Sequence, residues 1–150
     1  DLVRSRGLGD VYKRQPFGVP LPHDGASKPH PLAGVLARHH TLIPVCPEQL
    51  GGLSTPRPPA ERRGDRGVTR EGQDVTEQYR RGAEEALRLC HLMGCEAAIL
   101  KERSPSCGCG SIYDGTFSGR MHPGDGVTAE LLARCGIPVY GETKLEKFLK

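Results

Sequence analysis

Two short segments of this chain hold most of the residues that could do chemistry. The first, Cys46–Gly52 (CPEQLGG), brings a thiol and a carboxylate, Cys46 and Glu48, within one turn of chain. The second, Leu100–Ser111, holds Lys101, Ser104, Ser106, Cys107 and Cys109. Gly-rich turns can aim backbone N–H groups at a thiolate or at sulfide, so a metal site is one interpretation. A tight turn with an incidental cysteine is the alternative for each segment.

The elements around these segments alternate between strand and helix. Short apolar runs predict buried strands at Thr41–Val45, Ala97–Leu100 and Ile137–Tyr140. Helical patterns lie between and after them, at Pro31–His40, Asp74–Met93, Asp125–Arg134 and Lys144–Leu149. This alternation predicts an α/β fold: one three-layer domain with a parallel sheet and right-handed crossovers.

The predicted sheet groups the cysteines. Cys46 directly follows the first of these strands and Cys107 follows the second, so both should lie at the carboxyl edge, where such sheets bind ligands. The helix-end cysteines Cys90, Cys95 and Cys135 are expected to be small buried hydrophobic residues.

The ligand types indicate which metal would bind. The two segments supply thiolates but no histidine at zinc-finger spacing, and only His23 cannot be placed away from them. Incomplete, sulfur-only ligation favours an iron–sulfur cluster over zinc. A cluster held by fewer than four cysteines leaves one iron able to bind a substrate atom.

Composition narrows the class of protein. The 150 residues include 21 Lys and Arg against 18 Asp and Glu, so the net charge of +3 is too small to argue for nucleic acid. The 20 Gly and 13 Pro indicate many turns. No apolar run could span a membrane, and there is no signal-peptide pattern, so we expect a cytoplasmic protein of one domain.

The first fifteen residues differ from the rest. Asp1–Gln15 (DLVRSRGLGDVYKRQ) has no sustained apolar period and resembles a translated sequencing-adapter scar; a natural disordered tail is the alternative. We therefore expect residues 1–15 to be loosely packed and to form no strand, and residues 16–150 to form the domain.

Three longer segments resemble a known family. Pro44–Glu61, Gly72–Leu87 and Ile99–Leu132 are similar to the small bacterial domain-of-unknown-function family that includes the thiouracil desulfidases. The resemblance covers about Gly18–Tyr140. It implies a single α/β domain, a 4Fe-4S cluster on three cysteines, and non-redox removal of sulfur from a thiolated pyrimidine such as 2-thiouracil, with release of sulfide.

The resemblance assigns the cluster ligands residue by residue. Cys46 and Cys107 match two of them. The third belongs to an S-x-C-L-x-G motif at the end of the family's first strand, and it aligns at about Gln15, where the scar has replaced it. The first strand is then lost as well, and activity should be impaired. Cys109 is an additional thiol that could substitute.

The resemblance and local chemistry together suggest further roles. Glu48 is the best carboxylate for proton transfer, with helix capping or pairing to Arg57 as its structural alternatives. Lys101 and Ser104 could polarise water or the substrate. Substrate-binding residues are predicted at Asp24, Gly25 and Ser106, and Ser106 could instead donate to a thiolate.

A second class of function stays open at this point. The chain could be a non-catalytic metal- or cluster-binding protein, or it could carry a persulfide on Cys107. The expected partner is a small thio-substrate, with no nucleic acid and no membrane.

Overall fold

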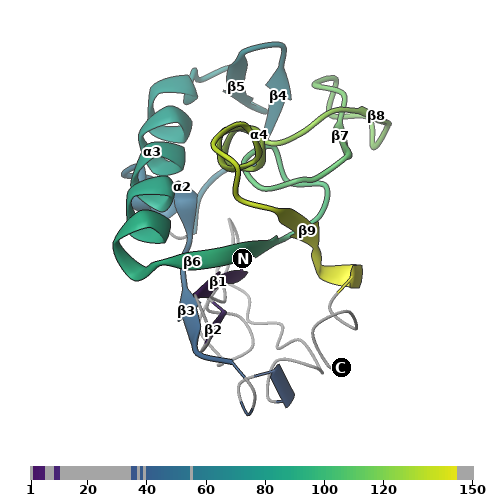
Figure 1. The fold of residues 1–150 in the computed structure, drawn as a ribbon. Helices are drawn as coiled ribbons and strands as arrows, with labels where there is room; N and C mark the ends of the chain where they lie inside the picture. The colour runs from purple at the N-terminus through teal and green to yellow at the C-terminus, as the bar shows by residue number, and fades with distance from the viewer. Residues whose placement is uncertain are drawn as a thin grey trace.

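A mixed sheet supports the molecule (Figure 1). The computed structural model describes residues 2–5, 9–10, 35–36, 38, 40–54 and 56–144. Strand β6 (Cys95–Leu100) pairs in parallel with β9 (Val139–Gly141) and antiparallel with β1 (Leu2–Ser5). Strand β1 also pairs antiparallel with β3 (Leu42–Pro44) and with the short β2 (Gly9–Asp10).

The three strands predicted from apolar runs are confirmed as members of one sheet. Because β3 and β6 both run antiparallel to β1, they run in the same direction, and β9 follows β6. Leu100 at the end of β6 is fully buried, as expected for a strand covered on both faces.

The expectation that residues 1–15 form no strand is wrong for β1 and β2, and β1 makes the sheet mixed rather than wholly parallel. Strand pairing uses only main-chain N–H and C=O groups, so a segment without a family sequence can still pair with β3 and β6. Their unpaired edges are a template for any extended chain.

The predicted helices lie near their expected bounds. Helix α3 (Thr76–Met93) ends at Gly94, whose φ of 63° is the left-handed conformation that glycine adopts readily. Helix α4 (Val127–Arg134) packs against α3. Buried side chains of these helices meet those of β6 in one core, which includes Cys90, Ala98, Leu100, Cys107, Ala129 and Leu132. The third layer stays a prediction.

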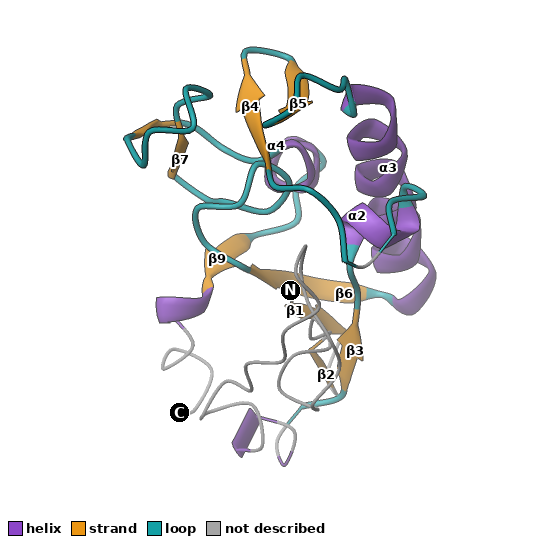
Figure 2. Cartoon of the chain, turned by 180° about the vertical axis from the view of Figure 1, so that it is seen from behind, coloured by secondary structure: helices purple, strands orange, loops and turns teal. Residues whose placement is uncertain are grey.

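Two hairpins were not predicted (Figure 2). Strands β4 (Ala60–Arg63) and β5 (Arg66–Thr69) pair antiparallel in a polar segment. Strands β7 (Ser111–Tyr113) and β8 (Met121–Pro123) pair antiparallel further along the chain. Each strand is only three or four residues long, too short for alternation to be recognised.

Helix α2 (Pro47–Leu50) crosses α3 at unusually short range. A Cβ on Gly82 would lie 1.8 Å from the Pro47 carbonyl oxygen, and a Cβ on Gly51 would lie 1.8 Å from the Gln78 carbonyl oxygen. Real Cβ contacts never come this close, so both positions require glycine. The backbones of α2 and α3 therefore lie in close contact at these two positions.

The remaining cysteines divide by position. Cys90 is buried, and a hydrogen bond to Cys95 together with burial raises its pKa. Cys135, at the C-terminal end of α4, is exposed, so its predicted burial is wrong: it points to solvent beyond the helix's apolar face.

Other expectations lie partly outside the described residues. Leu36 in the predicted helix 31–40 is fully buried, whereas Leu32 and residues 145–149 are not described. No helix in the described ranges is long and apolar enough to cross a membrane.

Candidate active site

The first cysteine loop is fixed by a rigid helix start. Cys46 lies two residues beyond the end of β3 and directly precedes α2, whose first residue, Pro47, has no N–H to leave unpaired at a helix N-terminus. The Cys46 side chain is only 4% exposed. The next residue in α2, Glu48, is also buried, although a carboxylate is costly to bury without a partner.

Arg57 is that partner. Its Nε lies 2.5 Å from Glu48 Oε2, its Nη1 donates to the Ser54 carbonyl at 2.9 Å, and its Nη2 lies 3.8 Å from Cys46 Sγ. One guanidinium therefore neutralises the buried carboxylate and faces the sulfur. The structural alternative for Glu48, pairing to Arg57, is present, and it holds the carboxylate next to the thiol rather than away from it.

Tyr79 is the buried hydrogen-bond partner of Glu48. It is 2% exposed on α3, and its pKa is raised, first by burial and then by Glu48, to which the phenol is hydrogen-bonded. Cys107 also contributes to this shift. No motif in the sequence marks Tyr79, although it is the buried aromatic residue of α3, and a buried phenol needs a partner.

The second cysteine loop is built on two serines. Ser104 Oγ accepts the N–H groups of Ser106 and Cys107, both at 3.2 Å, so its own proton remains for another acceptor. Ser106 Oγ lies 3.1 Å from Thr128 Oγ1 and 3.6 Å from Cys107 Sγ. Ser106, Cys107 and Thr128 are all 0% exposed. The hydroxyl groups of Thr128 and Ser106 thus form a chain of contacts that ends at the sulfur of Cys107.

The N-terminus of α4 holds this loop in place. Val127 N donates to Pro105 O at 3.0 Å, and Thr128 N donates to Ser106 O at 2.7 Å. A Cβ on Gly126 would lie 2.3 Å from the Ser106 carbonyl carbon, so only glycine lets the loop approach. The helix's first N–H groups, which lack partners inside the helix, are satisfied by the loop's carbonyls.

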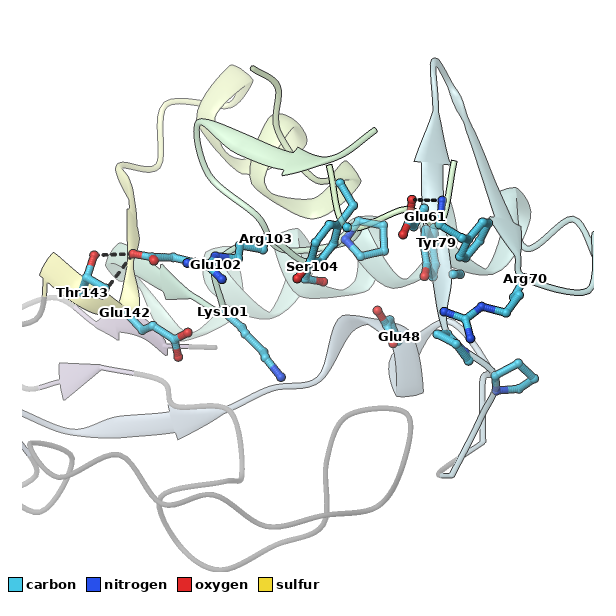
Figure 3. Close-up of a pocket in the computed structure, with 17 residues that line it drawn as sticks. Glu48, Glu61, Arg70, Tyr79, Lys101, Glu102, Arg103, Ser104, Glu142 and Thr143 are labelled. Atoms are coloured by element: carbon cyan, nitrogen blue, oxygen red, sulfur yellow. Dashed lines mark hydrogen bonds between the residues drawn. The ribbon is translucent and has the colours of Figure 1, made fainter. Parts of the chain in front are cut away.

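The three predicted catalytic residues line one pocket of about 840 Å³. Figure 3 shows Glu48, Lys101 and Ser104 around its middle, with Arg70 and Glu61 towards one end and Glu102 and Thr143 towards the other. A carboxylate, an ammonium group and a hydroxyl that share a pocket can hold and transfer protons on a small polar ligand.

Other predicted site residues lie elsewhere. Ser106 is fully buried, is absent from the pocket lining and faces Thr128, and its Oγ accepts the Cys107 thiol, so both of its suggested roles stay predictions. Cys109 is exposed, and its Sγ lies 3.8 Å from the Val139 carbonyl of β9. Burial and the carboxylates of Asp125 and Glu102 raise the pKa of Cys109. Asp24 and Gly25 lie outside the described residues.

The described residues do not form a complete metal-binding site. All six cysteines are free thiols, and no three His, Cys, Asp or Glu side chains in the described ranges gather as a metal site. That Cys46 and Cys107 share one cluster stays a prediction.

Comparisons with known proteins agree with the motifs. Residues 17–144 match a family model described as 2-thiouracil desulfurase. The chain is 42% identical over 142 residues to a Bacillus subtilis (strain 168) protein named Uncharacterized protein YbbK, covering 88% of this chain and 94% of that one. It is 43% identical to the solved 4Fe-4S-dependent thiouracil desulfidase TudS, with a TM-score of 0.87 and 95% of each chain covered. The resemblance seen in the sequence is confirmed: the chain belongs to the 2-thiouracil desulfurase family.

Proposed function

We propose that this protein removes sulfur from a thiolated pyrimidine such as 2-thiouracil, without net redox change, and releases sulfide. The observation that carries the proposal is the arrangement of Glu48, Lys101 and Ser104 in one pocket. Glu48 pairs with the Arg57 guanidinium that faces Cys46 Sγ, and Ser104 Oγ accepts the backbone N–H of Cys107. The solved relative named as a thiouracil desulfidase supports the same activity. A cytoplasmic location and a small-molecule partner remain expectations from the sequence.

The donor set suits an iron–sulfur cluster on the cysteines that are present. Cys46 and Cys107 are both buried, and each sulfur has a polar neighbour, Arg57 Nη2 for one and Ser106 Oγ for the other. Such contacts compensate thiolate charge. When bound there, a 4Fe-4S cluster would supply a Lewis acid for the substrate's sulfur.

The chain's own residues carry the proton transfers. Glu48, held in position by Arg57 and Tyr79, accepts a proton from the water that attacks the thiocarbonyl carbon. The hydroxyl of Ser104 and the ammonium group of Lys101 stabilise the charge that develops on the ring. The carbon gains the oxygen of water and loses sulfide, so a thiocarbonyl becomes a carbonyl and no electrons are exchanged.

We propose that this chain lacks the third cysteine ligand of the cluster. The family model matches from residue 17, and we infer that the family's third cysteine aligns shortly before it, at Gln15. We infer that residues 1–15 are a scar and that cluster binding and activity are impaired as written. Substrate contacts by Asp24 and Gly25 stay a prediction.

Two alternative functions have less support. A persulfide carrier needs a thiol that a partner can reach, and Cys107 is 0% exposed. A non-catalytic cluster-binding protein would need no Glu48 aimed into a pocket.

Turnover tests the proposal directly. The chain is reconstituted with iron and sulfide without oxygen and incubated with 2-thiouracil, and uracil and sulfide are measured. We expect both products in equal amounts, and at least about 100-fold slower release by Glu48→Gln, which cannot accept the proton. Cluster binding without either product, in this chain and in a form with its first strand repaired, would favour the non-catalytic alternative.

A further inference from the structure

The carboxylate of Glu61 connects strand β4 to the loop that contains Gly115 and Phe117, and the proposed chemistry uses neither segment. Glu61 of β4 is 8% exposed, and its Oε1 accepts the N–H groups of Gly115 and Phe117, each at 3.0 Å. These partners lie 54 and 56 residues away in the chain. Figure 3 shows Glu61 at the edge of the pocket with one of these bonds.

The loop that Glu61 holds has a backbone that needs support. Phe117 has a φ of 57°, in the left-handed region that a bulky side chain rarely adopts. Within the loop, Asp114 Oδ1 accepts the Thr116 N–H at 2.9 Å. Because such a conformation persists only where its surroundings enforce it, the two bonds to Glu61 fix the direction in which Phe117 leaves the backbone.

The side chain fixed in this way lines the same pocket as Glu48 and Ser104. Two guanidinium groups flank its ring: Arg63 Cζ is 5.9 Å and Arg70 Cζ is 5.7 Å from the centroid of Phe117. Arg70 lines the pocket, whereas Arg63 does not and instead donates through Nε to the Gly115 carbonyl at 2.7 Å. Arg63 thus contacts both the ring and the loop backbone, and Phe117 lines the pocket together with Arg70.

We infer that Phe117 and Arg70 form a flat wall that contacts the planar heteroaromatic ring of the substrate, and that Glu61 is the positioning residue for this wall. Aromatic rings and guanidinium planes are the groups on which nucleobases stack. The inference rests on the proposed function only for the type of ligand. Glu61 acts through Phe117, because its Oε1 is already engaged by the loop.

Ligand binding to the chain without a cluster tests the wall separately from turnover. The dissociation constant for uracil is measured by equilibrium dialysis. Phe117→Leu, which keeps an apolar side chain but loses the ring, should weaken binding about tenfold, in the range of one base–aromatic stack. Glu61→Ala should weaken it as much, whereas Glu61→Gln, which keeps an acceptor oxygen, should stay within about twofold of the unaltered chain.

The double variant distinguishes positioning from general damage. Glu61→Ala combined with Phe117→Leu should bind no more weakly than Phe117→Leu alone, because both changes remove the same contact. Glu71→Gln, an exposed carboxylate just beyond β5, is the matched control and should bind like the unaltered chain.

Three results would overturn the inference: additive losses, unchanged binding by Glu61→Ala, or no uracil binding by the unaltered chain. Sulfide release plays no part in these measurements. A chain that binds uracil as described but never desulfurates would therefore contradict the proposed function and leave this wall standing.

Discussion

Arg57 contacts both the Glu48 carboxylate and the Cys46 sulfur, so one side chain shapes the surroundings of two site residues. Both partners of the ion pair are almost fully buried, with side chains 5% and 10% exposed. The pair contributes little to the free energy of unfolding, because the desolvation of two buried charges offsets most of their attraction. Its main effect is to fix the positions of the two side chains.

Removing only Arg57 should therefore be worse than removing both charges. Arg57→Gln leaves the buried carboxylate without its cation and should lower the free energy of unfolding by about 3 kcal/mol. The double variant Glu48→Gln, Arg57→Gln should recover most of that loss. Urea denaturation measures both, with exposed Arg88→Gln as control. Equal losses in the single and double variants would mean that the pair is not coupled.

The hydroxyls behind Cys107 give a second test at the same scale. Thr128→Val keeps the side-chain shape but leaves Ser106 Oγ without its 3.1 Å partner, so we expect a loss of about 1–2 kcal/mol in urea. Thr128→Ser keeps the hydroxyl and should lose clearly less. If Val were tolerated as well as Ser, the Ser106–Thr128 contact would contribute nothing to the loop that carries Cys107.

Among the elements, the crossing of α2 and α3 determines where Cys46 and Glu48 lie. Gly82→Ala would improve the intrinsic helix propensity of α3 by about 1 kcal/mol. It would also place a methyl group against the Pro47 carbonyl, 1.8 Å away before any shift. We expect the clash to dominate, with a net loss of about 2 kcal/mol in urea and displacement of α2. A gain in stability would show that the helices can separate without cost.

The start of α3 is joined to β5 by an acid-sensitive contact. Asp74 accepts the Thr76 N–H at 2.9 Å and pairs with Arg66 at 2.8 Å, and these partners lower its pKa to about 2. Because the folded pKa is below the unfolded value, the carboxylate stabilises the fold above about pH 4. That contribution disappears as the pH falls towards 2.

Asp74→Asn should remove this pH dependence. The variant keeps an acceptor for Thr76 but has no charge for Arg66, so its melting temperature should lie below that of the unaltered chain at pH 6 and approach it near pH 2. Thermal unfolding from pH 2 to pH 6 measures the difference. A constant gap between the two proteins over this range would rule out Asp74 as the titrating group. Glu77→Gln on the same helix turn is the control.

For the whole molecule, the N-terminal segment decides whether the site can be complete. Strand β1 pairs with both β3 and β6 and so joins them in one sheet. This pairing supplies no third thiol, and the described residues hold no group of three metal-binding side chains. The chain as written should bind iron poorly, since each missing thiolate removes strong, charge-compensating ligation.

Repair of the N-terminus should restore the site. Replacing residues 1–15 by a family-like strand that ends in Cys at position 15 should give a brown, air-sensitive protein that releases sulfide from 2-thiouracil. Gln15→Cys alone should restore less, because the strand that directs the ligand would still be missing. Iron content and sulfide release measure both. If the unrepaired chain already matches the repaired one, another thiol, such as Cys109, is the third ligand.

The sequence by itself determined the elements whose signal is local. Apolar runs predict β3, β6 and β9, because a buried strand needs consecutive apolar side chains. Gly94 marks the end of α3, because few other residues adopt its backbone conformation. The strand-end rule and the motifs brought Glu48, Lys101 and Ser104 into one pocket.

Only the tertiary structure decided the contacts between distant segments. Nothing local in the chain says that Tyr79 meets Glu48, that Thr128 supports Ser106, or that Glu61 holds the loop of Phe117. Nor does the composition of residues 1–15 show that β1 pairs with β6, since that pairing depends on which backbone edges the rest of the fold leaves open. Periodicity reports which face of an element is buried, whereas a partner for a polar group is set by how the elements cross.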